Sequence, residues 1–208
     1  MDPHRISTAQ QLREVVGEEL PLTAAKVFPE LEETAEAFIR ASPFLILSTA
    51  DAKGNIDVSP KGDPPGFVRI ENSKTLLIPD RTGNKMALGH LNVLENPKVG
   101  LIFLLPGTPE TLRLSGVAEL SRDPSLLASM EVRGKPAVLA IRVHVEEVFF
   151  HCPKAFMRSK LWDSASWGER RRISMGKILA RRLDKDTKFA QAIDDFTEQS
   201  RQELAKRI

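Results

Sequence analysis

The sequence predicts a mainly β protein with additional helices, in which an antiparallel β-barrel is flanked by N-terminal and C-terminal helices. Between residues 44 and 150, short apolar segments alternate with turns rich in Gly, Asn, Asp and Pro, which is typical of strands joined by tight connections. Parallel strands need crossovers of about a dozen residues or more, so strands joined by such short turns pair antiparallel. On both sides of this region, apolar residues recur at helical spacing.

The first 42 residues are expected to be helical. A serine or threonine at positions 7–8 can cap a helix that runs to about Val16 and ends at Gly17. A second helix is expected to begin near Pro29, because three glutamates in its first turn suit the positive end of the helix dipole. The dipeptide Ser42-Pro43 ends it.

The middle of the chain is expected to contain seven strands and two helices, and helices follow again after Pro153. The expected strands are 44–50, 56–60, 67–70, 75–79, 99–105, 111–120 and 138–150, with helices at 86–94, 124–130, 173–183 and 185–207. This pattern divides the chain into an N-terminal helical segment (1–42), the barrel (43–152) and a C-terminal helical extension (153–208). The extension is expected to pack on the barrel, giving one overall domain.

The composition excludes several classes of protein. Of the 208 residues, 41% are hydrophobic, enough for a sizeable core, yet no apolar run approaches the roughly 18 residues of a membrane span. Thirty Lys and Arg against 28 Asp and Glu leave a net charge of only +2, and tyrosine is absent, so a nucleic-acid partner is not expected. A single cysteine and an N-terminus without an apolar signal core favour a cytoplasmic location with no membrane partner.

The run from Pro79 to Lys85 connects an expected strand to an expected helix and is a candidate phosphate site. Unpaired amides at a helix start carry partial positive charge, which suits a phosphate. Arg81 and Lys85 add two full charges, and Gly83 lets the backbone approach closely. The alternative is an ordinary surface turn, capped by Asn84, with two solvated cations.

The strand 56–62 presents two different faces. Because side chains alternate along a strand, Asp57, Ser59 and Lys61 lie on one face, and Ile56, Val58 and Pro60 form an apolar face expected to point to the core. The alternative is an amphipathic edge strand that faces water.

Two further segments carry candidate residues. Thr111, Arg113 and Ser115 repeat the alternation on a later strand, although an arginine there is more often a paired structural group or a rim residue. The segment 149–162 combines aromatics, His151, Cys152 and three cations; it could contact a flat heteroaromatic ligand, or simply pack a helix onto the barrel.

The sequence gives little support for a metal site or for a nucleophilic catalytic residue. The four histidines show no metal-ligand spacing, and one cysteine cannot complete a multi-cysteine site. No GxSxG nucleophile motif is present. No metal site is therefore expected, and no catalytic side chain can be named.

Taken in order, these motifs resemble the pyridoxamine 5'-phosphate oxidase-like FMN-binding proteins. The matching segments are Ile46-Leu47-Ser48-Thr49, Asp57-Val58-Ser59-Pro60-Lys61-Gly62, Leu76-Leu77-Ile78-Pro79-Asp80-Arg81, Gly83-Asn84-Lys85, Asn96-Pro97 and Leu112-Arg113-Leu114-Ser115-Gly116. The stretch from His151 to Trp162 is similar to one subgroup of FMN-dependent enzymes without an assigned reaction.

The resemblance implies a split β-barrel homodimer with two FMN sites at the subunit interface. Asp57, Ser59 and Lys61 would lie along the flavin, and Arg81, Asn84 and Lys85 would hold its 5'-phosphate. Thr111 and Arg113 would border the flavin, while Arg158 and Trp162 would cover it from the other subunit.

The implied function is an FMN-dependent oxidoreductase that acts on an unidentified small molecule. True pyridoxamine phosphate oxidases carry an Arg-x-His element after a C-terminal tryptophan, and no counterpart follows Trp162 or Trp167, so oxidation of vitamin B6 is not expected. Two alternatives remain open. One is a non-catalytic flavin-binding or haem-binding protein on the same barrel, and the other is a deazaflavin in place of FMN.

Overall fold

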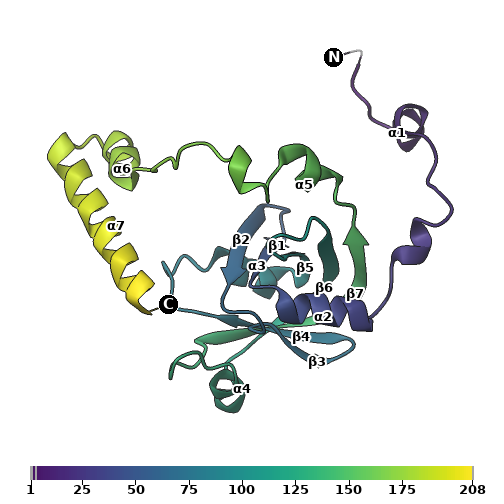
Figure 1. Cartoon of the computed structure of the whole chain (residues 1–208), viewed down its shortest axis with the longest axis horizontal. Coiled ribbons are helices and arrows are strands. Elements are labelled where there is room, and N and C mark those ends of the chain that lie inside the picture. Colours follow the sequence, from purple (N-terminus) through teal and green to yellow (C-terminus); the bar gives the residue numbers. More distant parts are fainter. Residues whose placement is uncertain (1, 3, 208) are drawn as a thin grey trace. The chain divides into compact units, whose positions relative to one another are not determined.

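The computed structural model describes residue 2 and residues 4–207, with side chains as far as Glu203 (Figure 1). The chain forms two compact units, Met1–Ser164 and Ala165–Ile208. The first unit contains the sheet, and the second contains the helices α6 and α7. The boundary therefore falls twelve residues after the one expected at residue 152, and packing of the C-terminal extension on the barrel stays a prediction.

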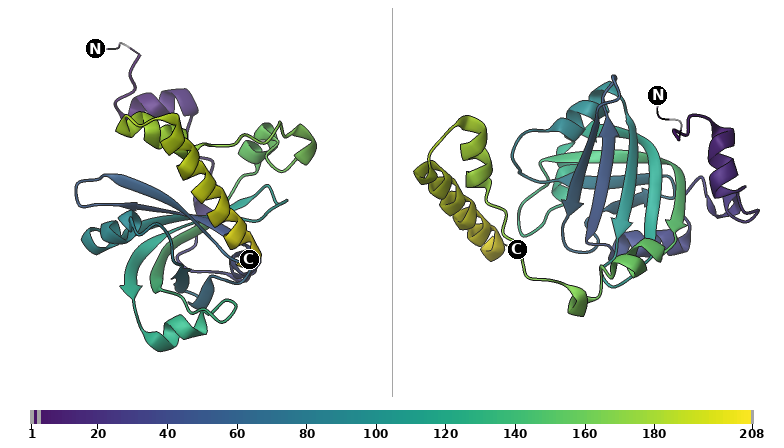
Figure 2. Two further views of the ribbon diagram at one scale, coloured as in Figure 1. Left: turned by 90° about the vertical axis from the view of Figure 1, so that its left-hand side faces the viewer. Right: turned by 90° about the horizontal axis from the view of Figure 1, so that it is seen from above.

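Seven antiparallel strands form one curved sheet in the order β2-β1-β5-β6-β7-β4-β3 (Figure 2). The antiparallel split β-barrel with flanking helices that the sequence predicts is confirmed. The strands are β1 (Phe44–Ala50), β2 (Ile56–Gly62), β3 (Arg69–Asn72), β4 (Thr75–Asp80), β5 (Lys98–Leu104), β6 (Thr111–Ser121) and β7 (Leu139–His151).

The helices of the first unit are short, and α1, α2 and α4 each have a side-chain cap at the N-terminus. Thr8 and Gln11 form a reciprocal capping box at the start of α1, which ends at Gly17 as expected. Pro124 follows the capping Asp123 at the start of α4. The helices are α1 (Ala9–Val16), η1 (Ala24–Lys26), α2 (Glu33–Ala41), α3 (Leu88–Glu95), α4 (Pro124–Ser129) and α5 (Lys154–Ser159), followed by η2 (Ser164–Ser166) across the unit boundary.

The helix α2 begins at Glu33 and not near Pro29 as expected. The residues before it are held in extended conformation by the sheet, since Phe28 exchanges backbone hydrogen bonds with Val148 and the Leu31 amide donates to Ser73. The Glu32 carboxylate then accepts from the amides of the first turn. Tertiary pairing thus overrides the local preference of the glutamates for a helix start.

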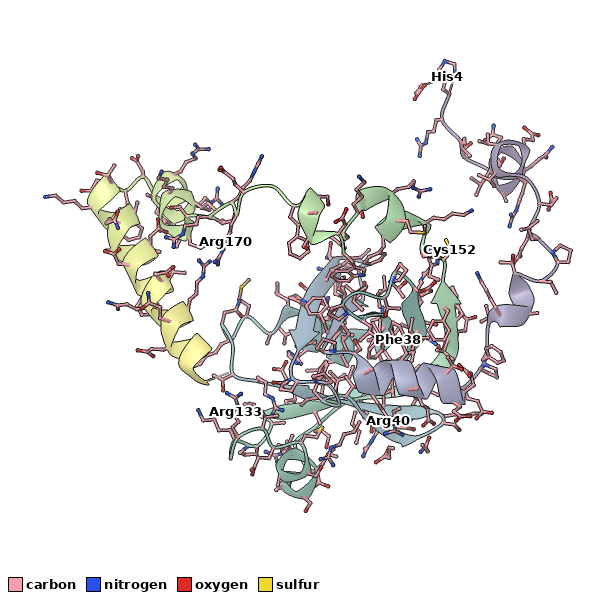
Figure 3. The ribbon with its side chains drawn as sticks, viewed as in Figure 1. His4, Phe38, Arg40, Arg133, Cys152 and Arg170 are labelled. Atoms are coloured by element: carbon pink, nitrogen blue, oxygen red, sulfur yellow. The ribbon has the colours of Figure 1, made fainter. Side chains whose placement is uncertain are left out.

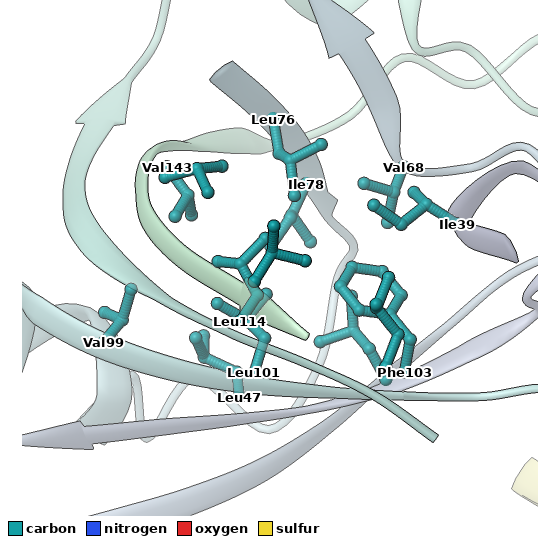
Figure 4. Packing of buried hydrophobic residues seen from close by; sticks show 14 of the residues in the cluster. Ile39, Leu47, Val68, Leu76, Ile78, Val99, Leu101, Phe103, Leu114 and Val143 are labelled. Carbon is teal, nitrogen blue, oxygen red and sulfur yellow. The ribbon is translucent and has the colours of Figure 1, made fainter. Parts of the chain in front are cut away.

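The core lies on the inner face of the curved sheet, where Ile39 of α2 joins residues of the strands (Figure 4). Alternate residues of β1 and β5, among them Leu47, Leu101 and Phe103, are almost completely buried there. Phe38 of α2 closes the core against Phe150, with the two rings edge to face and their centroids 5.4 Å apart.

The second unit is a helical hairpin of α6 (Met175–Leu183) and α7 (Thr187–Arg207). Asp194 of α7 accepts hydrogen bonds from the Ser174 hydroxyl and the Gly176 amide, which joins the two helices at one end. Gly176 is required there, because a Cβ atom at this position would lie 1.9 Å from the Ala190 carbonyl oxygen.

Within the described residues, no helix combines the length and the apolar composition needed to cross a bilayer.

The long strands β6 and β7 are interrupted by a register shift. Their register jumps between Ser115, which pairs with Glu147, and Gly116, which pairs with Val145. Such a bulge increases the local twist and bends the strand. Gly116 lies at the jump, and a Cβ atom there would come 2.1 Å from the backbone carbonyl oxygen of His144.

We expect Gly116→Ala to lower the free energy of unfolding by about 1–3 kcal/mol, the usual result of forcing an atom into a filled site. Chemical denaturation of the purified protein measures this. Gly100→Ala is the matched control on β5, since its Cβ would come no nearer than 4.0 Å to Ser48. Equal effects of the two substitutions would show that the bulge tolerates a side chain.

Candidate functional site

A cavity of about 860 Å³ lies between the edge strand β2, the end of β4 and the start of α3, within the size range of small-molecule sites. It is lined by Leu47, Asp57, Ser59, Pro60, Lys61, Gly62, Val138, Leu139 and the continuous run from Pro79 to His90. It therefore joins the two sequence segments that were separately singled out, the polar face of β2 and the loop after β4.

The polar face of β2 points inward, which corrects the expectation that Ile56, Val58 and Pro60 form the core face. Ile56 and Val58 are 72% and 60% exposed, whereas the alternating polar residues are half-buried, namely Asp57, Ser59 and Lys61. Strand register explains the reversal. Lys61 pairs with Leu45, and directly opposed residues share one face of a sheet, so Lys61 continues a row of core residues.

Asp80, at the end of β4, is the counter-ion of this inward face. Its Oδ1 lies 2.5 Å from Lys61 Nζ and 3.6 Å from His90 Nε2, the latter beyond hydrogen-bonding distance. Burial by itself would raise the pKa of Asp80, but the neighbouring imidazole and the Lys61 ammonium outweigh burial and lower the pKa to about 2. Asp80 is thus a carboxylate at any physiological pH.

Arg81, the next residue, is held rigidly at the cavity wall. Its Nε donates to Asp63 Oδ2 over 2.7 Å, and Nη2 donates to the Met130 carbonyl over 2.9 Å. Its remaining nitrogen, Nη1, is buried and has no hydrogen-bond partner among the described residues. An unpaired buried donor is unfavourable, so a ligand oxygen in the cavity would complete the guanidinium's hydrogen bonding.

The loop after Arg81 has an unusual backbone. Lys85 and Ala87 have φ angles of 62° and 54°, in the left-handed region. Asn84 accepts a hydrogen bond from the Met86 amide and so stabilises this turn; it does not cap the helix. The helix α3 starts at Leu88 and not at Met86 as expected, after Ala87, which has no side-chain acceptor for the first amides.

The helix α3 is fixed close to the polar face of β2. Asn92 donates to the buried hydroxyl of Thr49 over 3.1 Å, and Thr49 lies on β1 directly opposite Asp57 of β2. One turn earlier, a Cβ atom at Gly89 would lie 3.1 Å from Asp57 Oδ2, so the helix comes closest to β2 where it has no side chain. This approach brings His90 into the cavity wall.

The structure brings together six of the ten candidate residues and separates four. Asp57, Ser59, Lys61, Arg81, Asn84 and Lys85 all line the cavity, whereas Thr111, Arg113, Arg158 and Trp162 do not. Thr111 is buried at the start of β6. Arg113 is exposed, with its guanidinium carbon 5.1 Å from the Phe149 ring centroid.

The last two candidates lie beyond β7. Arg158 is exposed on α5. Trp162 stacks on Phe156, with centroids 5.6 Å apart, and donates to the Thr108 carbonyl over 2.9 Å. This helix and tryptophan are thus packed on the loop between β5 and β6, as in the plainer of the two interpretations. Cys152 is exposed between β7 and α5 (Figure 3).

Sequence reasoning missed Asp63, Asp80 and His90 as members of the site. One signal could have pointed to the two aspartates, because half-buried cations such as Lys61 and Arg81 need carboxylates nearby. Nothing in the periodicity of 86–94 indicated which side of the helix His90 would occupy. In the described part of the chain, no His, Cys, Asp and Glu side chains group in a way that could hold a metal ion.

We expect the Asp80 ion pair to stabilise the fold fully above about pH 4, and this stabilisation to disappear as pH falls towards 2. The sign follows from the pKa, which is about 2 in the folded protein against an ordinary 3.8. Asp80→Asn should therefore lower the melting temperature at pH 7 but reduce its further fall between pH 5 and 2.5. Glu18→Gln, which removes an exposed carboxylate, is the control, and an unchanged acid response in Asp80→Asn would contradict the assignment.

Comparison with solved structures gives similar folds at low identity. HupZ from Group A Streptococcus is 20% identical, with 58% of this chain and 93% of that chain covered and a TM-score of 0.47. A Clostridium acetobutylicum protein related to general stress protein 26, of the pyridoxinephosphate oxidase family, is 15% identical, with coverages of 57% and 85% and a TM-score of 0.43. An FMN-binding protein from Syntrophomonas wolfei is 13% identical, with coverages of 56% and 80% and a TM-score of 0.41.

No curated protein matches the sequence significantly. A family model, however, matches residues 31–152, which is more than half of the chain and includes every strand of the barrel and the whole cavity wall. The description of that family is pyridoxamine 5'-phosphate oxidase, and the chain belongs to it.

Proposed function

We propose that the protein binds FMN in the β2–α3 cavity and is an FMN-dependent oxidoreductase acting on a small molecule. The observation that carries the proposal is the convergence of the polar face of β2, the Arg81–Lys85 loop and the uncapped start of α3 on one cavity. FMN needs an anion site, polar contacts and room for a flat ring system. Each of these has a counterpart in the cavity wall.

The phosphate end is assigned to the loop after β4. Lys85 is exposed at the cavity and supplies a full charge without a carboxylate partner among the described residues. Arg81 contributes its unpaired Nη1, and the first amides of α3 contribute partial positive charge. Phosphate oxygens accept all three kinds of hydrogen bond.

The ring and ribityl chain are assigned to the remainder of the cavity. Ser59 and Lys61 offer polar contacts, and Leu47, Val138 and Leu139 offer an apolar wall. The bound flavin would supply the redox chemistry, while the protein binds and orients it. Lys61 would bring positive charge near the reduced ring, moderated by its partner Asp80.

Oxidation of vitamin B6 is not part of the proposal. The only Arg-x-His letters near the barrel are Arg142-Val143-His144, and Arg142 is engaged elsewhere. Its two terminal nitrogens pair with Glu119 and Glu71 at 3.0 and 3.4 Å, at the outer surface of β7. Because both terminal nitrogens are engaged in ion pairs, Arg142 is not available to bind the phosphate of a vitamin B6 compound. The proposed small-molecule substrate is therefore not a B6 phosphate.

We further propose that the active form is a homodimer. The outer face of β2, β1 and β5 is apolar and exposed at Val58, Ile56 and Ile102, which is unusual for a free sheet surface. By register, Pro60, Ile46, Ile102 and Arg113 form one row across four strands on this face. A second copy would cover the apolar patch and let Arg113 approach the partner's flavin, although it lies outside its own cavity.

We expect Lys85→Ala and Arg81→Ala each to weaken FMN binding about ten- to hundredfold, the value of one charge-assisted hydrogen bond of about 1.5–3 kcal/mol. Riboflavin, which has no phosphate, should bind both variants nearly as it binds the wild type. Fluorescence titration of the apoprotein with each flavin at fixed ionic strength measures the difference.

Lys53→Ala is the matched control, because Lys53 is also exposed but lies in the β1–β2 turn, outside the cavity. If Arg81→Ala weakens both flavins equally, Arg81 only maintains the fold through Asp63. If both variants bind FMN like the wild type, the loop is an ordinary turn.

We expect the wild type to sediment as a dimer and Val58→Asp to dissociate it, since a charge replaces an apolar side chain on the proposed interface. Flavin binding should weaken in parallel. Leu22→Asp, at an 83% exposed position in the N-terminal segment, is the control and should remain dimeric. A flavin-loaded monomer of the wild type would refute the dimer.

A further inference from the structure

The charged groups around the cavity cancel one another. Among the described residues at its wall, the cations are Lys61, Arg81 and Lys85, and the carboxylates are Asp57 and Asp80. Asp63 adds a third carboxylate through its pair with Arg81. With His90 neutral, three positive charges thus face three negative charges. A phosphate dianion would therefore enter a site with no net charge of its own.

Among the described residues that line the cavity, His90 is the only imidazole, and imidazole is the side-chain type that serves proteins as a proton acceptor near neutral pH. Its side chain is 17% exposed, and Nε2 is buried 3.6 Å from Asp80 Oδ1 with no hydrogen-bond partner among the described residues. A lone pair on Nε2 would face the carboxylate's own lone pairs, so Nε2 carries the proton and Nδ1 remains to accept another. The Asp80 carboxylate would stabilise the resulting imidazolium, as a buried aspartate does in catalytic triads.

The other elements packed against α3 do not change the equal number of positive and negative charges at the cavity. The strand β2 presents Asp57 and Lys61, which are already counted. The strand β1 contains no titratable side chain. On β6, Glu119 is paired with Arg142, and Arg113 lies over the Phe149 ring. On α3 itself, Glu95 lies at the far end and accepts from the Ala52 amide.

We infer that His90 takes up a proton from solvent when a phosphorylated ligand binds in the cavity, and that this proton makes binding selective for the phosphorylated form. The inference rests on the proposed function. No covalent bond or electron transfer is involved: one proton moves from buffer to Nδ1, and the imidazolium then balances part of the phosphate charge. Affinity for FMN, but not for riboflavin, should therefore rise as pH falls.

Isothermal titration calorimetry of the apoprotein at pH 7.5, in Tris and in HEPES, measures the number of protons exchanged. The two buffers differ in ionisation enthalpy, so the difference in apparent binding heat gives this number. Cations beside a phosphate favour its dianion and would release protons from FMN. Net uptake therefore identifies a group on the protein.

For the wild type we expect uptake approaching one proton per FMN and none per riboflavin. The affinity for FMN should fall by up to about tenfold per pH unit above neutrality, the limit for one linked proton. In His90→Gln both the uptake and this pH dependence should disappear. In the complementary variant His4→Gln/His144→Gln/His151→Gln, which changes the three exposed histidines and keeps His90, both should persist.

Tight FMN binding without proton uptake would overturn this inference alone. So would equal uptake with FMN and riboflavin, unchanged uptake in His90→Gln, or loss of uptake in the triple variant. If His90→Gln does not fold, the triple variant and the comparison of the two flavins still decide. Failure of the wild type to bind either flavin would instead overturn the proposed function and the inference together.

Discussion

Opposed residues on neighbouring strands project to the same side of a sheet, and the pairing of β2 with β1 makes this rule decisive here. The rows that contain Leu45 and Leu47 in the core continue on β2 as Lys61 and Ser59. Polar side chains at the end of a hydrophobic row do not pack closely against apolar neighbours. The hydrophobic core therefore ends before β2, and a cavity lies beside Ser59 and Lys61. A shift of one residue would turn the apolar side of β2 inward and remove the site.

A half-buried ammonium in that position must have a counter-charge. Asp80 provides it from β4, the last strand but one at the other side of the sheet order, and the same carboxylate faces His90 of α3. The Arg81–Asp63 pair joins the following residue of the loop to the segment after β2 in the same way. Two ion pairs thus connect the edge strand β2 and the segment after it to β4 and its following loop, across the cavity. The charged groups of these two ion pairs neutralise one another and also connect the opposite walls of the cavity.

The sequence predicted most of the fold because the strands carry their own signals. Phe44–Ala50 has the predicted bounds, and the turn residues around it leave little choice. The local pattern could not show which face of a strand points towards the core. The alternation in β2 was recognised, yet its apolar side was assigned to the core, since only the register with β1 decides which side is inside. The start of α2 was misplaced for a related reason, because Phe28 pairs with β7, more than a hundred residues away. Asp63 pairs with a residue 18 positions away, and Asp80 with one 19 positions away. Sequence periodicity does not indicate such contacts, so neither aspartate was predicted to belong to the site.

The left-handed backbone of Lys85 and Ala87 has a consequence for redesign of the cavity. Each residue with a Cβ atom in this region costs roughly 1–2 kcal/mol relative to right-handed geometry, and glycine avoids most of that. At Ala87 glycine would remove the strain without removing a charge, at the expense of one methyl group in the cavity wall. At Lys85 the same change would delete the cation that faces the cavity. The loop therefore contains two strained residues that differ in what glycine would change. At Ala87 it would relieve strain and leave the charge of the cavity unchanged. At Lys85 it would relieve strain but remove a positive charge from the cavity wall.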